Sequence, residues 1–134
     1  FALSCMVGSR IQSNAVVPTA TGKLLKRGEL VMLGLALRYN GYAGVFGETL
    51  SVSGTFTQSQ RDTINVAKET YCAVRDMLRP GYCGKQIERI GATIYAKHGL
   101  SDYIVCPFLH AIGQTAFLWS QFFGRADAWN NCFN

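Results

Sequence analysis

The first part of the chain alternates apolar runs with polar breaks, a pattern typical of short strands joined by turns. Phe1–Val7 is apolar and ends at Gly8, which predicts a buried strand. The polar stretch Ser9–Asn14 follows and predicts a loop, which Pro18 and Gly22 prolong.

The most apolar part of the chain predicts a β-hairpin. Leu30–Tyr39 is almost unbroken in its hydrophobicity, and it ends at Asn40-Gly41, a strong signal for a tight turn between two strands. Tyr42–Val52 continues with residues that favour strands. A buried helix over Leu30–Leu37 is the alternative, and the turn and the strand-rich second arm favour the hairpin.

The middle of the chain changes to a spacing of three and four, which predicts two helices. The first begins after a cap at Thr57 or Ser59 and stops at Arg79-Pro80-Gly81. The second runs from about Lys85 to His98 and ends at Gly99, a residue suited to a left-handed C-cap. The apolar faces are formed by Ile64, Ala67, Tyr71, Val74 and Leu78 in the first helix and by Ile87, Ile90 and Ile94 in the second.

Two further apolar and aromatic runs, Tyr103–Phe108 and Ala116–Phe123, predict strands on either side of Gly113-Gln114. The order of elements predicts an α/β (α+β) domain with a mixed to antiparallel sheet and two helices on one face. Residues 1–123 form this domain, and residues 124–134 lose strand character and are expected to be a tail or connector.

Composition narrows the functional classes. The 134 residues are 49% hydrophobic and 16% charged, the balance of a compact domain that buries a core. The net charge of +5 comes from scattered residues without dense basic blocks, so we expect no nucleic-acid partner. No run of 18 apolar residues occurs, so we expect no membrane span.

The cysteines indicate the cellular compartment of the protein, and the first residue indicates how the chain begins. The five cysteines are widely spaced and form no Cys-x-x-Cys pair, which indicates free thiols in a reducing, cytoplasmic setting rather than a disulfide scaffold or a zinc site. The chain starts at Phe1 without a signal-peptide pattern, so we expect a fragment or a processed chain.

Five short motifs occur one after another along the chain. They are Lys26-Arg27-Gly28-Glu29-Leu30-Val31, Arg38-Tyr39-Asn40-Gly41-Tyr42, Glu48-Thr49-Leu50-Ser51-Val52-Ser53-Gly54, Leu78-Arg79-Pro80-Gly81 and His110-Ala111-Ile112-Gly113. In this combination the chain resembles the creatinase, Xaa-Pro peptidase and methionine aminopeptidase superfamily. The resemblance implies the first half of a pita-bread fold, whose second half would lie beyond Asn134.

The resemblance also implies a metal site, which this chain has lost. Enzymes of that superfamily hold two metal ions between an aspartate on each hairpin strand, the histidine of a Gly-His motif and two later glutamates. Aligned on the hairpin turn, the aspartate positions are Gly34 and Val45, which carry no ligand atom. His110 is retained, and the two glutamates would lie past the last residue. We therefore expect no metal and no other cofactor.

Two polar residues are left as catalytic candidates. His110 could act as a general acid or base near neutral pH, and a hydrogen-bonded core histidine is the alternative. Glu48 stands where the superfamily usually has an arginine, and a solvated strand-end carboxylate is the alternative. The loop Ser13-Asn14-Ala15-Val16-Val17-Pro18 lacks the histidine that related peptidases place before a proline, and Phe117 takes the downstream histidine position.

The remaining candidates concern ligands and partners. Phe117 and Trp119 could line an apolar ligand pocket, with core packing as the alternative. A half-fold with an exposed sheet edge is expected to associate with its own C-terminal half or with a second copy.

Two functions are therefore expected from the resemblance. The first is a metallopeptidase-like domain that has lost its dinuclear site and binds a small peptide, amide or amidine-like ligand or a protein partner. The second is a metal-independent hydrolase or lyase acting on a small amide or amine, with His110 as proton carrier.

Overall fold

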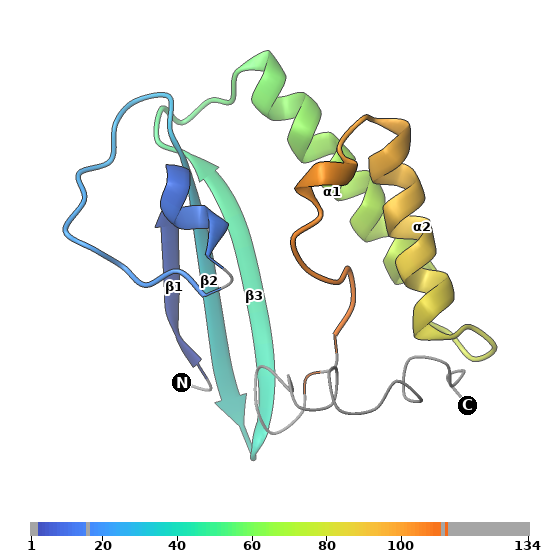
Figure 1. Ribbon diagram of the computed structural model, residues 1–134. Coiled ribbons are helices and arrows are strands. Elements are labelled where there is room, and N and C mark those ends of the chain that lie inside the picture. The colour runs from blue at the N-terminus through green and yellow to red at the C-terminus, as the bar shows by residue number, and fades with distance from the viewer. Residues whose placement is uncertain (1–2, 16, 111, 113–134) are drawn as a thin grey trace. The chain divides into compact units, whose positions relative to one another are not determined.

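The computed structural model describes residues 3–15, 17–110 and 112, and the chain divides into two compact units (Figure 1). Of the described residues, the first unit contains 3–15, 17–59 and 112, and the second contains 60–110. Each unit is described by itself below.

The first unit is built on a three-stranded antiparallel sheet with the order β1-β2-β3. The strands are β1 (Leu3–Ser9), β2 (Leu30–Tyr39) and β3 (Tyr42–Ser51). The predicted hairpin is confirmed, and the first strand lies two residues later than predicted. The sheet contains the buried residues Val31 and Ala36 of the central strand.

The hairpin turn is as tight as its sequence indicates. Tyr39 pairs directly with Tyr42, so Asn40 and Gly41 are its two turn residues. Both have positive φ angles, 47° and 85°, which matches the right-handed twist of the flanking strands. The turn therefore sets the register of all ten residue pairs between β2 and β3.

The segment between β1 and β2 is more ordered than the predicted loop. Residues Arg10–Asn14 form a 3₁₀ helix, η1, and the chain then returns along β1, where Thr19 forms a bridge with Met6 and the Val7 N–H donates to the Pro18 carbonyl at 3.0 Å. A Cβ on Gly8 would lie 3.0 Å from Pro18 and Ser13 atoms, so a glycine is needed for this close return.

The second unit contains the two predicted helices, α1 (Gln58–Asp76) and α2 (Gly84–Lys97). The first begins directly after Thr57, one of the two predicted cap positions. The second ends as predicted, because Gly99 has a φ of 68° and the N–H groups of Gly99 and Leu100 donate to the carbonyls of Ala96 and Tyr95. Val66, Thr70, Val74 and Ile87 are buried in this unit.

One carboxylate links the two helices. Glu69 of α1 lies 3.1 Å from the His98 ring at the end of α2 and 3.8 Å from the Lys97 ammonium. Figure 1 shows α2 running beside α1. The pairing orients the C-terminal turn of α2, from which the next segment departs.

The strand predicted over Tyr103–Phe108 is wrong. Ser101–Tyr103 is a single 3₁₀ turn, η2, and the residues from Ile104 to His110 have no regular structure. Pro107 has no N–H for a ladder, and the Leu109 N–H donates to the Glu88 side chain instead. The other predicted strand, Ala116–Phe123, and the tail 124–134 lie outside the described residues.

Neither helix is long and apolar enough to cross a membrane within the part of the chain that the structure describes. The described cysteines, Cys5, Cys72, Cys83 and Cys106, are free thiols.

Arg10 is held in an unfavourable backbone conformation. Its φ is 53°, which costs a residue with a Cβ about 1–2 kcal/mol, whereas glycine loses only about 0.5–1 kcal/mol of additional chain entropy on folding. We therefore expect Arg10→Gly to raise the free energy of unfolding by about 0.5 kcal/mol or more, measured by urea denaturation.

A matched control is Asn40→Gly, which changes the other non-glycine residue with positive φ among the described residues. Asparagine tolerates this conformation, so the gain there should be smaller. A lower stability of the Arg10→Gly protein would show that the side chain contributes more than the backbone costs.

Candidate functional site

The hairpin register places the two aspartate-equivalent positions together. Gly34 lies opposite Gly47 and Val45 lies opposite Ala36, so Gly34 and Val45 are on the same face of the sheet, one diagonal step apart. Side chains in this relation can meet across a distance of about 7–8 Å. The two residues share a face of the sheet, and their side chains supply no oxygen, nitrogen or sulfur ligand.

The space above Gly34 is filled from the neighbouring strand. Met6 of β1 pairs with Gly34, and a Cβ built on Gly34 would collide with the Met6 methyl group and lie 3.2 Å from its Cβ. Gly34 and Ala36 are buried, whereas Val45 is 40% exposed. A larger side chain at position 34 would therefore have to displace Met6.

Glu48 is placed away from this face. It pairs with Leu33, the residue next to Gly34, so successive residues point to opposite sides and Glu48 faces away from Gly34 and Val45. Its side chain is exposed. The register thus does not bring Glu48 to the two aspartate-equivalent positions, and its catalytic role stays a prediction.

His110 is half-buried in an irregular segment that α2 holds in place. The Leu109 N–H donates to the Glu88 carboxylate at 2.9 Å, and the Phe108 N–H is also directed at this group. Phe108 packs edge-on against Tyr95 with ring centroids 5.2 Å apart.

A glycine on α2 allows the segment before His110 to pack closely against this helix. The ring of Phe108 lies so close to α2 that a Cβ on Gly91 would be 2.5 Å from its Cδ2 atom. Glu88, Gly91 and Tyr95 follow one another at intervals of three and four, so they occupy one face of α2. This face fixes the two residues that precede His110, and sequence analysis missed it because the contacts join residues about 17 positions apart.

The electrostatics of this segment do not favour a cysteine nucleophile. Desolvation raises the pKa of the Cys106 thiol, and the negative charge of Glu88 raises it further. Partial burial likewise raises the pKa of Glu88, an effect that the N–H groups of Phe108 and Leu109 partly offset. The Cys106 thiol is therefore kept in its less reactive protonated form.

The other predicted site residues are placed only in part. Val17, which precedes Pro18 where related peptidases have a histidine, is 39% exposed. Phe117 and Trp119 lie outside the described residues, so their role in a ligand pocket stays a prediction. Across residues 3–15, 17–110 and 112 no group of three or more His, Cys, Asp or Glu side chains could hold a metal ion.

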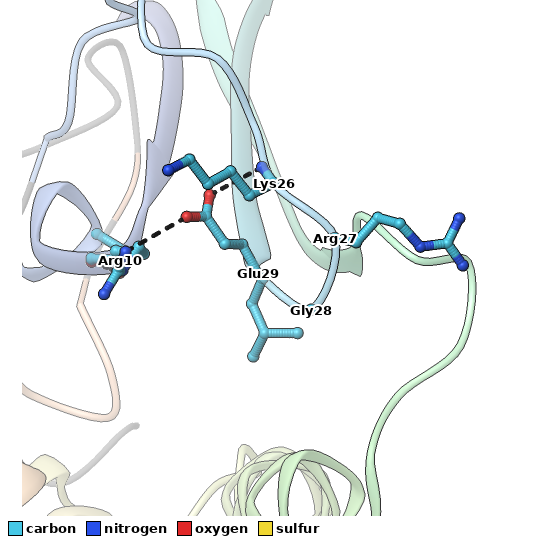
Figure 2. A pocket seen from close by; sticks show the side chains of 7 residues that line it. Arg10, Lys26, Arg27, Gly28 and Glu29 are labelled. Atoms are coloured by element: carbon cyan, nitrogen blue, oxygen red, sulfur yellow. Dashed lines mark hydrogen bonds and ion pairs between the residues drawn. The ribbon is translucent and has the colours of Figure 1, made fainter.

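Two cavities lie elsewhere, at the start of β2, and neither is lined by His110 or Glu48. One of about 580 Å³ is lined by Arg10, Ser13 and the turn from Lys26 to Leu30. The other, of about 390 Å³, is lined by residues 9–12 and Lys23. Arg10 belongs to both, and Figure 2 shows its guanidinium next to the Glu29 carboxylate.

Glu29 is the anchor of this region. Its side chain is 8% exposed and lies 2.5 Å from the Lys23 ammonium and 3.7 Å from the Arg10 guanidinium. The hydrogen bond from Lys23 lowers the pKa of Glu29, and the Lys26 N–H and the charges of Lys23 and Arg10 lower it further against an opposing effect of burial. Sequence analysis used Lys26-Arg27-Gly28-Glu29 only as a motif. The missed signal was the spacing of Lys23, Lys26 and Arg27 directly before Glu29.

Comparison with known proteins establishes the family. The model of metallopeptidase family M24 matches residues 2–123, nearly the whole chain. This chain belongs to metallopeptidase family M24. Membership confirms the resemblance drawn from the five motifs, and the described strands and helices match the N-terminal part of the pita-bread fold.

Individual relatives of this M24 chain are Xaa-Pro peptidases. The Xaa-Pro dipeptidase of Pyrococcus furiosus is 26% identical over 102 residues, which cover 76% of this chain and 29% of the relative. The Xaa-Pro aminopeptidase of Escherichia coli is 35% identical over 57 residues, 42% of this chain and 13% of the relative.

The solved structures agree. Prolidase from Pyrococcus furiosus matches with a TM-score of 0.81 and 25% identity, over 88% of this chain and 35% of that chain. Prolidase from Pyrococcus horikoshii matches with a TM-score of 0.80 and 24% identity, over 88% of this chain and 34% of that chain. The M24 chain thus spans about a third of the length of these relatives.

The Glu88 contact generates a prediction for His110. Glu88→Ala removes the acceptor of the Leu109 N–H, so we expect the segment to shift and the His110 ring signals to move or broaden in NMR spectra. Glu88→Gln keeps an acceptor oxygen and should leave those signals near their original positions. The chain has only two histidines, which makes the spectra simple to assign.

His98 supplies the internal control. Its partner is Glu69, so Glu69→Ala should move the His98 signals and leave those of His110 unchanged. His110 signals that stay fixed in Glu88→Ala would contradict the assignment of Glu88 as a positioning residue.

The Glu29 anchor generates a pH dependence. Because the folded protein lowers the pKa of Glu29, the carboxylate contributes stability above its ordinary value of 4.5 and loses it as the pH falls through the lower folded value. We expect Glu29→Gln to be less stable than wild type at pH 7, with the difference shrinking as the pH is lowered below 4.5.

Urea denaturation at a series of pH values measures this effect. Lys23→Met removes the largest cause of the lowered pKa and should flatten the same part of the stability profile. A constant difference between Glu29→Gln and wild type over this pH range would exclude Glu29 as the titrating group.

Proposed function

We propose that this chain is a peptide-binding domain of family M24 that has no dinuclear metal centre of the type formed by two hairpin aspartates. The observation that carries the proposal is the diagonal placement of Gly34 and Val45 on one face of the hairpin, with Met6 packed over Gly34. Two divalent cations need several clustered oxygen ligands, and this face offers a glycine and a valine.

The donor set and the space both argue against a metal here. Of the five ligand positions implied by the family, the chain retains His110, and a single imidazole does not hold two ions. A carboxylate introduced at position 34 would meet the Met6 side chain. The side chains at these positions therefore speak against a dinuclear metal centre of this type.

The ligand class follows from the relatives. They are named as Xaa-Pro dipeptidases and an Xaa-Pro aminopeptidase, so we propose a small peptide with proline in the second position as ligand. His110 would donate a hydrogen bond to a carbonyl oxygen or accept one from an amide N–H of that peptide. Glu88 would keep His110 in position through the two residues before it.

A metal-independent hydrolase is the second candidate. An imidazole can transfer protons near neutral pH. His110 is half-buried and directly follows Leu109, whose N–H donates to the Glu88 carboxylate of α2. In this alternative His110 is the proton carrier, and further catalytic groups come from a longer chain or a partner.

A protein partner is also part of the proposal. Leu35, Leu37 and Phe46 of the hairpin are 38%, 57% and 57% exposed, and apolar side chains that gather on one sheet face favour burial against another surface. The partner would be the C-terminal half of the fold or a second copy of the chain. A cytoplasmic location is proposed on the free thiols of the described cysteines.

Calorimetric titration with Mn²⁺, Co²⁺ and Zn²⁺, followed by assays with Ala-Pro and Gly-Pro, tests the proposal. We expect no pair of metal ions per chain, no hydrolysis, and saturable peptide binding that shifts the His110 signals. His110→Ala should weaken this binding about tenfold, as the loss of one charge-assisted or well-placed hydrogen bond does.

The outcomes separate the candidates. Two tightly bound metal ions per chain with chelator-sensitive hydrolysis would overturn the proposal. Hydrolysis that persists with chelator and disappears in His110→Ala would support the metal-independent enzyme instead. The triple variant Met6→Ala/Gly34→Asp/Val45→Asp is the matched control for metal binding. It places a carboxylate at positions 34 and 45, and the shortened side chain at position 6 makes room for the one at position 34.

A further inference from the structure

The cavity at the start of β2 lies in a strongly basic part of the chain. Residues 1–59 contain five basic and two acidic residues, so they carry +3 of the net charge of +5. Four of the five basic residues, Arg10, Lys23, Lys26 and Arg27, line the two neighbouring cavities. The single carboxylate in this region is Glu29.

One cation is sufficient to neutralise Glu29. The Lys23 ammonium lies 2.5 Å from the Glu29 carboxylate, which is buried at 8% exposure. Lys26 meets the same carboxylate through its backbone N–H at 3.3 Å, so this contact does not use its ammonium group. Arg10 lies 3.7 Å away, beyond hydrogen-bond distance, with 68% of its side chain exposed.

Arg10 and Lys26 line the cavity, and the contacts of these two residues with Glu29 are a long ion pair and a backbone hydrogen bond. Figure 2 shows the side chains of Arg10 and Lys26 on the same side as the Glu29 carboxylate, whereas that of Arg27 extends in the opposite direction. The cavity of about 580 Å³ is in the size range of small-molecule sites. Positive groups that converge on such a space attract an anion with more than one negative charge.

Hydrogen bonds hold the turn that lines this cavity. The Glu29 N–H donates to the Lys26 carbonyl at 3.1 Å, the Val52 N–H donates to the Glu29 carbonyl at 3.0 Å, and the Gly28 N–H donates to Ser53 Oγ at 2.7 Å. These bonds tie the turn that carries Lys26 to the end of β3. A binding group on a fixed turn loses little freedom when a ligand binds.

Arg10 supplies an independent observation. Its positive φ of 53° is sparsely populated by residues with a Cβ, and such conformations concentrate at ligand sites. The Ser13 hydroxyl donates to the Arg10 carbonyl at 2.6 Å and helps to hold this conformation. The backbone thus keeps an arginine at a position where a glycine would be relaxed.

We propose that this cavity binds the doubly charged phosphate group of a small ligand, held by the Arg10 guanidinium and the Lys26 ammonium. Lys23 keeps Glu29 neutralised and so removes the repulsion that a lone carboxylate would exert. None of Gly34, Val45 and His110 lines this cavity, and the proposed phosphate binding does not depend on the proposed peptide binding.

Calorimetric titration of the chain with inorganic phosphate, pyrophosphate, phenyl phosphate and acetate tests the site. We expect saturable binding of the phosphates and at least about tenfold weaker binding of the monovalent acetate. Tighter binding of phenyl phosphate than of inorganic phosphate would assign the site to a phosphate monoester whose apolar part contacts Leu30. Equal affinity for the two would assign the site to the free phosphate ion.

Variants decide whether the cavity is responsible. Arg10→Gly, which relieves the backbone, and Lys26→Ala should each weaken phosphate binding about tenfold. Arg61→Ala and Lys68→Ala remove the same charge from exposed positions of α1 and should leave it unchanged. Absence of saturable phosphate binding, binding of acetate as tight as phosphate, or equal losses in the control variants would overturn the proposal.

Discussion

The register of the β2–β3 hairpin is the constraint on which the first unit depends. Asn40 and Gly41 both adopt positive φ angles, and this two-residue turn leaves no freedom for the strands to slip. A shift by one residue would exchange the two faces of the sheet, so every cross-strand pair follows from the turn. Gly34 and Val45 share a face for this reason alone.

The two units use the same device to order segments that are neither helix nor strand. In the first, the Glu29 carboxylate accepts hydrogen bonds from Lys23 and the Lys26 backbone. In the second, the Glu88 carboxylate accepts the Leu109 N–H, and the ring of Phe108 packs over Gly91. A partly buried carboxylate needs such partners, and by taking them from the backbone it orders the chain around it.

The N-terminal part of the M24 fold is formed here around a hairpin that needs no polar side chain at positions 34 and 45. Gly34 is buried and Val45 is 40% exposed, and the Met6 side chain of β1 fills the space above Gly34. The hairpin is held by the backbone pairing of its two strands and by its two-residue turn.

The sequence alone determined the hairpin, its turn, both helices and the glycine C-cap, because each depends on residues close together along the chain. It also identified the family, since the order of five local motifs is a property of the sequence. The prediction of a strand over Tyr103–Phe108 was wrong. Its apolar composition indicated a strand, but the segment is irregular because Pro107 has no N–H to donate and the Leu109 N–H donates to the Glu88 carboxylate. Tertiary structure alone decided which residues approach across long separations: Met6 over Gly34, Phe108 over Gly91, and Arg10 beside Glu29. Such contacts depend on how the chain folds back on itself, which no local pattern of hydrophobic and polar residues encodes.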